Sequence, residues 1–298
     1  MNEPQSWTYP PVQVGLVGAG PWAQAMHARM LATGPETELV GVWARRLDAA
    51  REAAAPYGAD AFESFDRLLD RCEAIAFAVP PAVQADLAVR AARQGRALLL
   101  EKPLGPDLAS ARRVADAVTE AGVVSQLVLT KRYHPTTRTF LAEADGMQVT
   151  GARSCYLHGA FLGGAFSTAW RLEHGALLDL GPHLLDLLDL AVGPIATVRG
   201  AGDPRRWIEL TCEHENGAIS QASLSGSVRL PRARTRVELF GPDRELVYDT
   251  ADLDHEECWP VLRREFAEAV RTGKGSGPDA ARGLRLQELL DQAAGQGR

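Results

Sequence analysis

The fold is decided by a stretch near the N-terminus, which reads Val12-Gln13-Val14-Gly15-Leu16-Val17-Gly18-Ala19-Gly20-Pro21-Trp22-Ala23. A short apolar run, typical of a buried strand, leads directly into a G-x-G-x-x-A pattern that opens a helix. In this context Gly18 allows a tight turn, Gly20 allows the backbone to approach a pyrophosphate, and Ala23 lets the helix pack on the strand. Pro21 suits the first helical position, where its missing N–H would have no partner in any case. We predict a dinucleotide site that includes Gly18, Gly20, Pro21, Trp22 and Ala23; a glycine-rich turn without a ligand is the alternative.

Further apolar runs alternate with amphipathic stretches up to about residue 129. The expected strands are Val12–Val17, Glu38–Ala44, Ala74–Val79, Ala97–Leu100 and Val123–Leu129. They are apolar on both faces, as expected when helices cover both sides of a parallel sheet. Residues 1–129 are therefore predicted to form a doubly wound α/β Rossmann domain.

The pattern changes after Lys131, and residues 130–298 are predicted to form a substrate-binding and oligomerisation domain of the α+β class. A helix at Thr136–Ala142, a strand at Gln148–His158 and a leucine-rich helix precede a run of strands with hairpin-like turns. The later strands are expected at Trp207–Glu213, Ala218–Ser225, Thr235–Phe240 and Arg244–Tyr248, and two helices at Val261–Arg271 and Asp279–Ala293. Hairpin turns indicate a mainly antiparallel open sheet.

Composition narrows the class of protein. The chain has 298 residues, 23% charged, and a formal net charge of -6, which disfavours nucleic acid as a partner. Its four cysteines lie far apart, so neither a disulfide framework nor a metal site is suggested. The segment Met1–Pro11 reads as a polar lead-in rather than a signal peptide, and apolar runs are too short or too charged to cross a bilayer. We expect a soluble, cytoplasmic protein.

The end of the second expected strand bears on the choice of dinucleotide. It reads Val42-Trp43-Ala44-Arg45-Arg46, without the carboxylate that commonly binds the adenine ribose of NAD. Arg45 and Arg46 offer charge for a 2′-phosphate instead, so the sequence favours NADP over NAD. The alternative is that both arginines are a solvated helix start and that NAD is also accepted.

A lysine follows the expected strand Ala97–Leu100, within Glu101-Lys102-Pro103. It lies at the carboxyl edge of the sheet, where ligands of doubly wound folds bind. An ammonium there can hydrogen-bond a substrate oxygen whose charge changes during hydride transfer. From position alone, an ordinary surface lysine is an equal alternative.

The leucine-rich stretch Leu177–Leu190 carries a few ionisable groups on an apolar background. If it is helical, Asp179, His183 and Asp186 share one stripe at i, i+4 and i+7. Because a helix that is apolar nearly all round is buried, these groups are either paired or functional. Pro182 leaves an alternative open, in which the regular helix begins near Asp179 and that aspartate is only an N-cap.

Taken together, these motifs resemble the glucose-fructose oxidoreductase, inositol dehydrogenase and MocA family of NAD(P)-dependent oxidoreductases over nearly the whole chain. The landmarks are Gly18-Ala19-Gly20, Glu101-Lys102-Pro103, Arg132-Tyr133-His134-Pro135, Trp170-Arg171, the stretch from Leu177 to Asp186, and Phe266–Lys274. Their order and separations make the combination specific.

The resemblance implies a catalytic group of Lys102, Asp179 and His183, acting on a sugar, a sugar nucleotide or a cyclic polyol. In that mechanism His183 exchanges the proton of the reacting hydroxyl, Asp179 lines the pocket, and Lys102 contacts the hydroxyl and the nicotinamide end. Arg132, Trp170 and Arg171 are expected beside the substrate, although the tryptophan is equally expected to be structural. Pro80 and Glu101 complete the expected cofactor contacts, and a homodimer or homotetramer is expected.

Two departures from the family pattern are visible. Glu173-His174-Gly175 replaces a run of glycines, and the segment from Pro80 to Ala85 lacks the Asn or His often found there. These put the pocket shape and a nicotinamide contact in doubt. Two alternative functions also stay open: an NAD-dependent glycosidase of the same family, and a non-catalytic dinucleotide-binding sensor.

Overall fold

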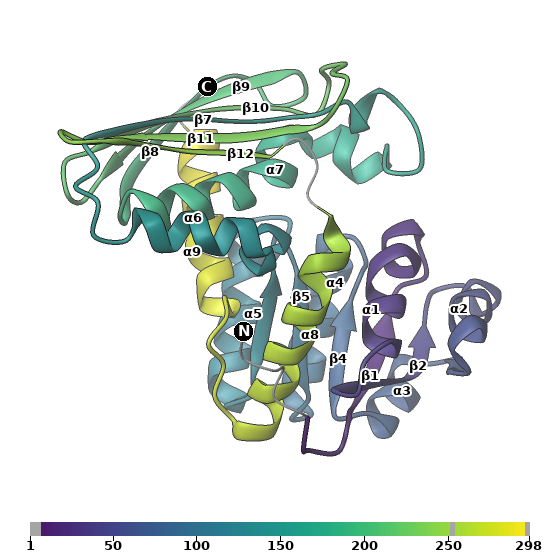
Figure 1. Cartoon of the computed structure of the whole chain (residues 1–298). Helices are drawn as coiled ribbons and strands as arrows, with labels where there is room; N and C mark the ends of the chain where they lie inside the picture. Colours follow the sequence, from purple (N-terminus) through teal and green to yellow (C-terminus); the bar gives the residue numbers. More distant parts are fainter. Residues whose placement is uncertain (1–6, 251–253, 296–298) are drawn as a thin grey trace. The chain divides into compact units, whose positions relative to one another are not determined.

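The computed structural model describes residues 7–250 and 254–295, so the first six residues of the expected lead-in lie outside it. The chain forms two compact units (Figure 1). One comprises Met1–Val128 and Trp259–Gly283, and the other comprises Leu129–Cys258 and Leu284–Arg298. The domain boundary expected between residues 129 and 130 stays a prediction. In the structure, residues 259–283 pack with the first compact unit.

The first unit is built on a six-stranded, entirely parallel sheet, which confirms the predicted doubly wound class. The strands lie in the order β3-β2-β1-β4-β5-β6. Their bounds are β1 Val12–Val17, β2 Thr37–Trp43, β3 Asp60–Phe62, β4 Ala74–Phe77, β5 Ala97–Glu101 and β6 Ser125–Val128. The strand order reverses between β1 and β4, and such a reversal is where open α/β sheets bind ligands. The short edge strand β3 was not predicted, because three residues with partly exposed side chains leave no apolar run.

Helices connect the parallel strands, as the alternating pattern predicted. They are α1 Arg29–Ala32 with the preceding π-helix Ala23–Ala28, α2 Leu47–Ala54, α3 Phe65–Arg71, α4 Pro81–Arg93 and α5 Leu108–Ala121. Local sequence sets where some of them begin. The Ser64 hydroxyl accepts a hydrogen bond from the backbone N–H of Arg67, and the Asp107 carboxylate accepts one from Ser110. Such N-caps satisfy donors that have no partner within the helix.

A distant segment completes the first unit. Helix α8, His255–Thr272, carries Arg263, whose Nε lies 2.7 Å from the buried Glu36 carboxylate. Arg271, the last residue but one of the helix, forms an ion pair of 2.6 Å with Glu73. The N–H of Leu127 on β6 then donates to the carbonyl of Pro278 at 2.6 Å. The C-terminal segment is therefore an integral part of the Rossmann unit.

The second unit is built on a mixed, mainly antiparallel sheet, as predicted. The order is β12-β11-β7-β10-β9-β8, and among these neighbours only β7 and β10 are parallel. The bounds are β7 Gly151–Leu157, β8 Ile195–Asp203, β9 Trp207–His214, β10 Ile219–Ser225, β11 Arg234–Phe240 and β12 Glu245–Thr250. Strand β8 was missed because its sequence mixes glycine and charge with few apolar residues.

Helices of the same unit cover one face of this sheet (Figure 1). They are α6 Pro135–Ala144, α7 Ala169–Ala191 and α9 Ala280–Gly295, together with short 3-10 turns at Thr130–Tyr133 and Ala160–Leu162. Alternate residues of β10 such as Ala222 and Leu224 are fully buried toward these helices. The intervening Ile219 and Gln221 are exposed on the opposite face. Within the described ranges, no helix has the length and hydropathy that crossing a membrane requires.

Candidate active site

The glycine loop after β1 has the geometry that its sequence predicted. Gly18 has a φ of 123°, and a Cβ at this position would lie 2.3 Å from the carbonyl oxygen of Ala78. The Gly18 N–H donates to the carbonyl of Trp43 at 2.9 Å, which fixes the turn against β2. A Cβ on Gly20, in contrast, would meet no atom of the chain within 4 Å. Packing therefore requires glycine at 18, whereas glycine at 20 leaves the backbone open to a close-lying pyrophosphate, which fits a dinucleotide.

The helix that follows the loop begins at Pro21, as expected, so its N-terminus lies just after the carboxyl end of β1. The N-terminus of a helix favours a negatively charged ligand. Trp22 was expected among the cofactor residues. Its indole Nε1 donates to Glu101 Oε1 at 2.6 Å. Trp22 therefore joins the helix after the glycine loop to the end of β5, where Lys102 follows.

Glu101 lies in a buried polar cluster behind Lys102. The same Oε1 lies 2.8 Å from Nε2 of His27, a fully buried residue of the π-helix. The side-chain amide of Gln84 on α4 accepts from the Glu101 N–H at 2.8 Å and donates to its carbonyl at 2.7 Å. These contacts fix the backbone just before Lys102, which is itself half-buried. Neither His27 nor Gln84 was predicted, since a histidine or glutamine inside a helix gives no motif signal.

The other expected cofactor residues lie at neighbouring strand ends of the same edge. Arg45 and Arg46 follow β2, and both are exposed. Pro80 follows β4 and directly precedes helix α4. This edge therefore carries the glycine loop, two cations and Lys102.

In the second unit, helix α7 carries the expected acidic and histidine residues on one buried stripe. Asp179, His183 and Asp186 are 3%, 7% and 1% exposed. Arg171 Nε lies 3.1 Å from Asp179 Oδ2, and Arg132 Nη1 lies 3.6 Å from Asp186 Oδ2. Both expected substrate arginines are thus brought to the stripe, and each is paired with a buried carboxylate.

The backbone of α7 excludes the alternative in which Asp179 is only an N-cap. The helix is broken at Gly175, with φ 74° and ψ -169°, and resumes at Ala176, so Asp179 lies inside it. Pro182 is accommodated within the helix. Trp170 lies before the break and stacks on the His174 ring with centroids 5.6 Å apart, which favours the structural alternative for this tryptophan.

Comparison with known proteins supplies the family. The model of the oxidoreductase family with NAD-binding Rossmann fold matches residues 12–128, and the GFO/IDH/MocA C-terminal domain matches residues 148–247. The dTDP-3,4-didehydro-2,6-dideoxy-alpha-D-glucose 3-reductase of Streptomyces violaceoruber is 30% identical, over 98% of this chain and 97% of the relative. The chain belongs to the GFO/IDH/MocA oxidoreductase family.

Two further proteins extend the comparison with the GFO/IDH/MocA family. The UDP-N-acetylglucosamine 3-dehydrogenase of Acidithiobacillus ferrooxidans is 29% identical over 78% of this chain and 72% of its own. The solved structure of GenD2 from gentamicin A biosynthesis, in complex with NAD, has a TM-score of 0.89 at 22% identity, covering 99% of this chain and 97% of that chain. The predicted NAD(P)-dependent oxidoreductase class is confirmed, and the relatives support it over the glycosidase and sensor alternatives. The roles of single residues remain predictions.

Two residues beside the stripe were not predicted from the GFO/IDH/MocA resemblance. Tyr156 on β7 contacts the His183 ring edge-to-face, with centroids 6.2 Å apart and an interplanar angle of 67°. The amine of Lys131 lies 4.2 Å from the centroid of the same Tyr156 ring. The sequence around Tyr156 shows only a tyrosine two residues before a histidine at the end of a strand, which is a weak signal. Lys131 precedes Arg132, and in the sequence the two look like an exposed basic pair.

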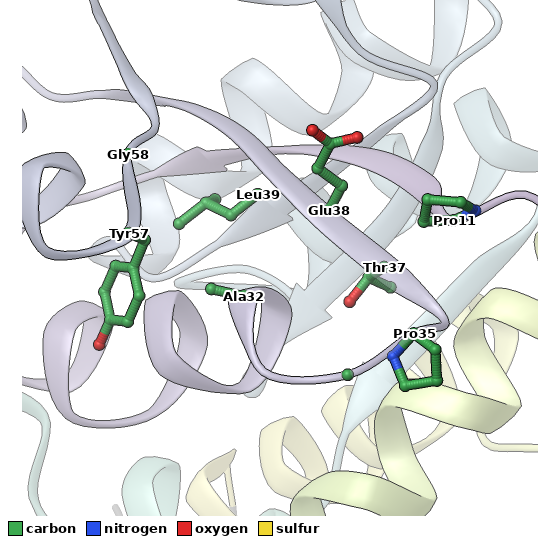
Figure 2. A pocket seen from close by; sticks show the side chains of 9 residues that line it. Pro11, Ala32, Pro35, Thr37, Glu38, Leu39, Tyr57 and Gly58 are labelled. Atoms are coloured by element: carbon green, nitrogen blue, oxygen red, sulfur yellow. The ribbon is translucent and has the colours of Figure 1, made fainter.

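A surface pocket of the first unit lies away from this chemistry. It is lined by residues at the amino end of β2 and on its neighbours: Pro11, Ala32, Gly34, Pro35, Thr37, Glu38, Leu39, Tyr57 and Gly58. Figure 2 shows that the Glu38 carboxylate and the Tyr57 hydroxyl point in different directions. Because the family's dinucleotide loop lies at the opposite, carboxyl end of the strands, this pocket is not the predicted site.

Proposed function

We propose that this chain transfers a hydride between NADP(H) and a ring carbon of a nucleotide-linked sugar, interconverting a hydroxyl and a ketone. The observation that carries the proposal is a full-length relationship to a sugar-nucleotide 3-reductase, combined with a buried histidine–carboxylate stripe on α7. A second relative acts at the same numbered position of another nucleotide-linked sugar. Position 3 of the sugar ring is therefore the proposed reaction site.

The cofactor half of the proposal assigns the residues of the carboxyl edge. Gly18, Gly20 and the helix start at Pro21 would hold the pyrophosphate, and Arg45 with Arg46 would pair with a 2′-phosphate. The nicotinamide, when bound, accepts or returns the hydride with its electron pair. Pro80, Glu101 and Lys102 would lie toward that ring.

The proton half of the proposal rests on Lys102, Asp179 and His183. During oxidation the hydroxyl proton passes to a ring nitrogen of His183 as the hydride leaves the carbon, and during reduction His183 returns it. The Lys102 ammonium would hydrogen-bond the reacting oxygen and stabilise its partial negative charge. Asp179, held by Arg171, would favour the imidazolium that forms on His183.

The activity is tested with NADPH and a panel of dTDP- and UDP-linked 3-ketosugars. Oxidation of NADPH is followed by the decrease of its nicotinamide absorbance. We expect turnover with at least one sugar, and a loss of about 100-fold or more in kcat for His183→Asn and Lys102→Met. Cofactor binding by His183→Asn, measured by fluorescence, controls for folding. Turnover at the wild-type rate in both variants would remove these residues from the mechanism.

Assembly and location complete the proposal. We infer a homodimer or homotetramer formed through the uncovered face of the second sheet, where Trp207, Ile219 and Val247 are each more than 40% exposed. A cytoplasmic location stays a prediction of the sequence.

A further inference from the structure

Lys131 is an unusual lysine because its whole side chain is buried. It is 8% exposed, and its Nζ donates to Thr235 Oγ1 on β11 at 2.8 Å. Lysines are almost never buried without a carboxylate partner, yet among the described residues no carboxylate forms an ion pair with Lys131. Burial lowers the pKa of Lys131 to about 7, and Cys258 acts in the opposite direction. Burial raises the pKa of the Cys258 thiol itself to about 12. A buried amine at this cost to stability calls for a function.

The face of the Tyr156 ring receives this amine. Lys131 Nζ lies 4.2 Å from the ring centroid, within the range of a cation–π contact. Thr235 is the cross-strand neighbour of Tyr156, so the two partners of the amine are fixed by one register pair. The amine is therefore held by two adjacent strands rather than by a flexible loop.

The other contacts of Tyr156 connect this amine to the proposed catalytic histidine. The ring packs edge-to-face on His183 of α7 at 6.2 Å and on His158 at 5.5 Å. Because both distances are measured to the same centroid, the Lys131 amine and the His183 ring centre lie within about 10 Å of each other.

Tyr156 itself stays a neutral phenol. Burial raises the pKa of its hydroxyl, and Asp179 raises it further, while Arg171 lowers it and Tyr248 of β12 raises it slightly. Its ring, rather than its proton, is what His183 contacts. The titratable groups that act on the pair therefore include Cys258 beside Lys131, and Asp179, Arg171 and Tyr248 beside Tyr156.

We propose that Lys131 and Tyr156 are positioning residues for His183: the Tyr156 ring orients the imidazole, and the Lys131 amine behind the ring disfavours a positive charge on it. The inference rests on the proposed function, in which His183 exchanges the substrate proton. A base that returns readily to the neutral form is ready for the next turnover. Asp179 and Lys131 therefore act on the imidazole in opposite directions, and its affinity for the proton is set between them.

The test is a histidine NMR titration of the full chain, which needs no substrate. His183→Asn identifies the His183 signal. Lys131→Met removes the amine but keeps the side-chain volume. Two unit charges no more than about 10 Å apart predict an upward shift of the His183 midpoint by roughly 0.5 pH unit or more. Lys274→Met, which removes an exposed lysine, is the matched control and leaves the midpoint unchanged. An unchanged midpoint in Lys131→Met would overturn the electrostatic half of the inference.

The ring is tested separately. Tyr156→Phe keeps the ring, so the His183 signal is expected to keep its shift and line width. Tyr156→Leu removes the ring, and a changed and broadened signal is expected as the imidazole loses its fixed orientation. Identical signals in all three proteins would overturn the positioning role of Tyr156. Should Lys131→Met not fold, Lys131→Gln provides the same charge comparison.

Kinetic measurements distinguish failure of the proposed function from failure of the coupling between Lys131 and His183. The kcat of wild type and Lys131→Met is measured against pH, with NADPH and a nucleotide-linked 3-ketosugar that the wild type reduces. The limb of the pH profile that reports His183 is expected to shift in Lys131→Met by the same amount as the NMR midpoint. A shifted NMR midpoint with no activity on any sugar refutes the proposed function but not the coupling. Activity with no NMR shift refutes the coupling alone.

Discussion

Single residues of this enzyme carry charges whose surroundings decide their behaviour, and Lys131 is the clearest case. Its pKa of about 7 in the folded chain lies below the ordinary value of 10.5 that it regains on unfolding. Unfolding therefore takes up a proton between these two values, and this group's destabilising effect is complete below pH 7 and fades as the pH rises toward 10.5. Lys131 should thus make the protein more stable in mild alkali than at neutrality.

This sign leads to a stability prediction for Lys131→Met. The variant is expected to be more stable than wild type at pH 7, and its advantage should shrink by about 2 kcal/mol at pH 9. Urea unfolding at both pH values measures the difference, in which all other titrating groups cancel. Lys274→Met should show no such change between the two pH values. If the stability advantage of Lys131→Met is the same at pH 7 and pH 9, the pKa of Lys131 is not lowered in the folded protein.

The proposed preference for NADP rests on single residues as well. Arg45 and Arg46 are exposed at the end of β2, and the loss of one cation that pairs with a 2′-phosphate costs about 1.5–3 kcal/mol. We expect Arg45→Ala to weaken NADPH binding by roughly 10- to 100-fold and to leave NADH binding nearly unchanged, as measured by fluorescence titration. Arg51→Ala on the exposed side of α2 is the matched control. Equal affinity of the wild type for both nucleotides would contradict the NADP preference.

Among the elements, helix α7 contains one backbone position that requires glycine. At Gly175 the φ of 74° favours glycine, and a Cβ would lie 2.3 Å from the Pro204 carbonyl oxygen. At Gly146 the φ is 75° but a Cβ would meet nothing within 4 Å. Substitution of Gly146 therefore measures backbone strain alone, whereas substitution of Gly175 measures backbone strain together with a steric clash.

We therefore expect Gly146→Ala to lower the free energy of unfolding by about 1 kcal/mol, and Gly175→Ala to lower it by roughly 3 kcal/mol or more. Denaturant unfolding measures both. Because Asp179 and His183 follow this break by one and two turns, Gly175→Ala should also reduce kcat. Equal costs at the two sites would show that the chain at Pro204 yields to the added methyl group.

Elements that depend on neighbouring residues could be predicted from the sequence. Elements and contacts that depend on residues far apart in the chain could not. Strand β1 with Gly18 and Gly20 was predicted because turn, strand and helix signals are contiguous. Strand β8 and the burial of Lys131 were not, since the partner of that lysine, Thr235, is 104 residues away. The stripe on α7 was predicted from spacing alone, but its pairing with Arg171 and Arg132 needed the fold.

For the whole molecule, the proposed assembly is testable through the uncovered face of the second sheet. Gln221 lies exposed near the centre of that face and is the cross-strand neighbour of Arg153. A second cation there would place like charges together in any pairing of two such faces. Gln221→Arg is expected to lower the mass found by light scattering, whereas Gln94→Arg at the end of α4 should not. An unchanged mass in both would place the interface elsewhere, or show a monomer.

The return of residues 259–283 to the first unit has a consequence for synthesis of the chain. The ion pairs of Glu36 with Arg263 and of Glu73 with Arg271, and the hydrogen bond from Leu127 to Pro278, all join residues more than 100 positions apart. On a ribosome, the sheet of the first unit is made early, but these partners emerge only after residues 129–258 have been translated. The six strands of the Rossmann sheet can therefore be made well before helix α8 is available, and the first unit gains its two long-range ion pairs only once that helix has emerged.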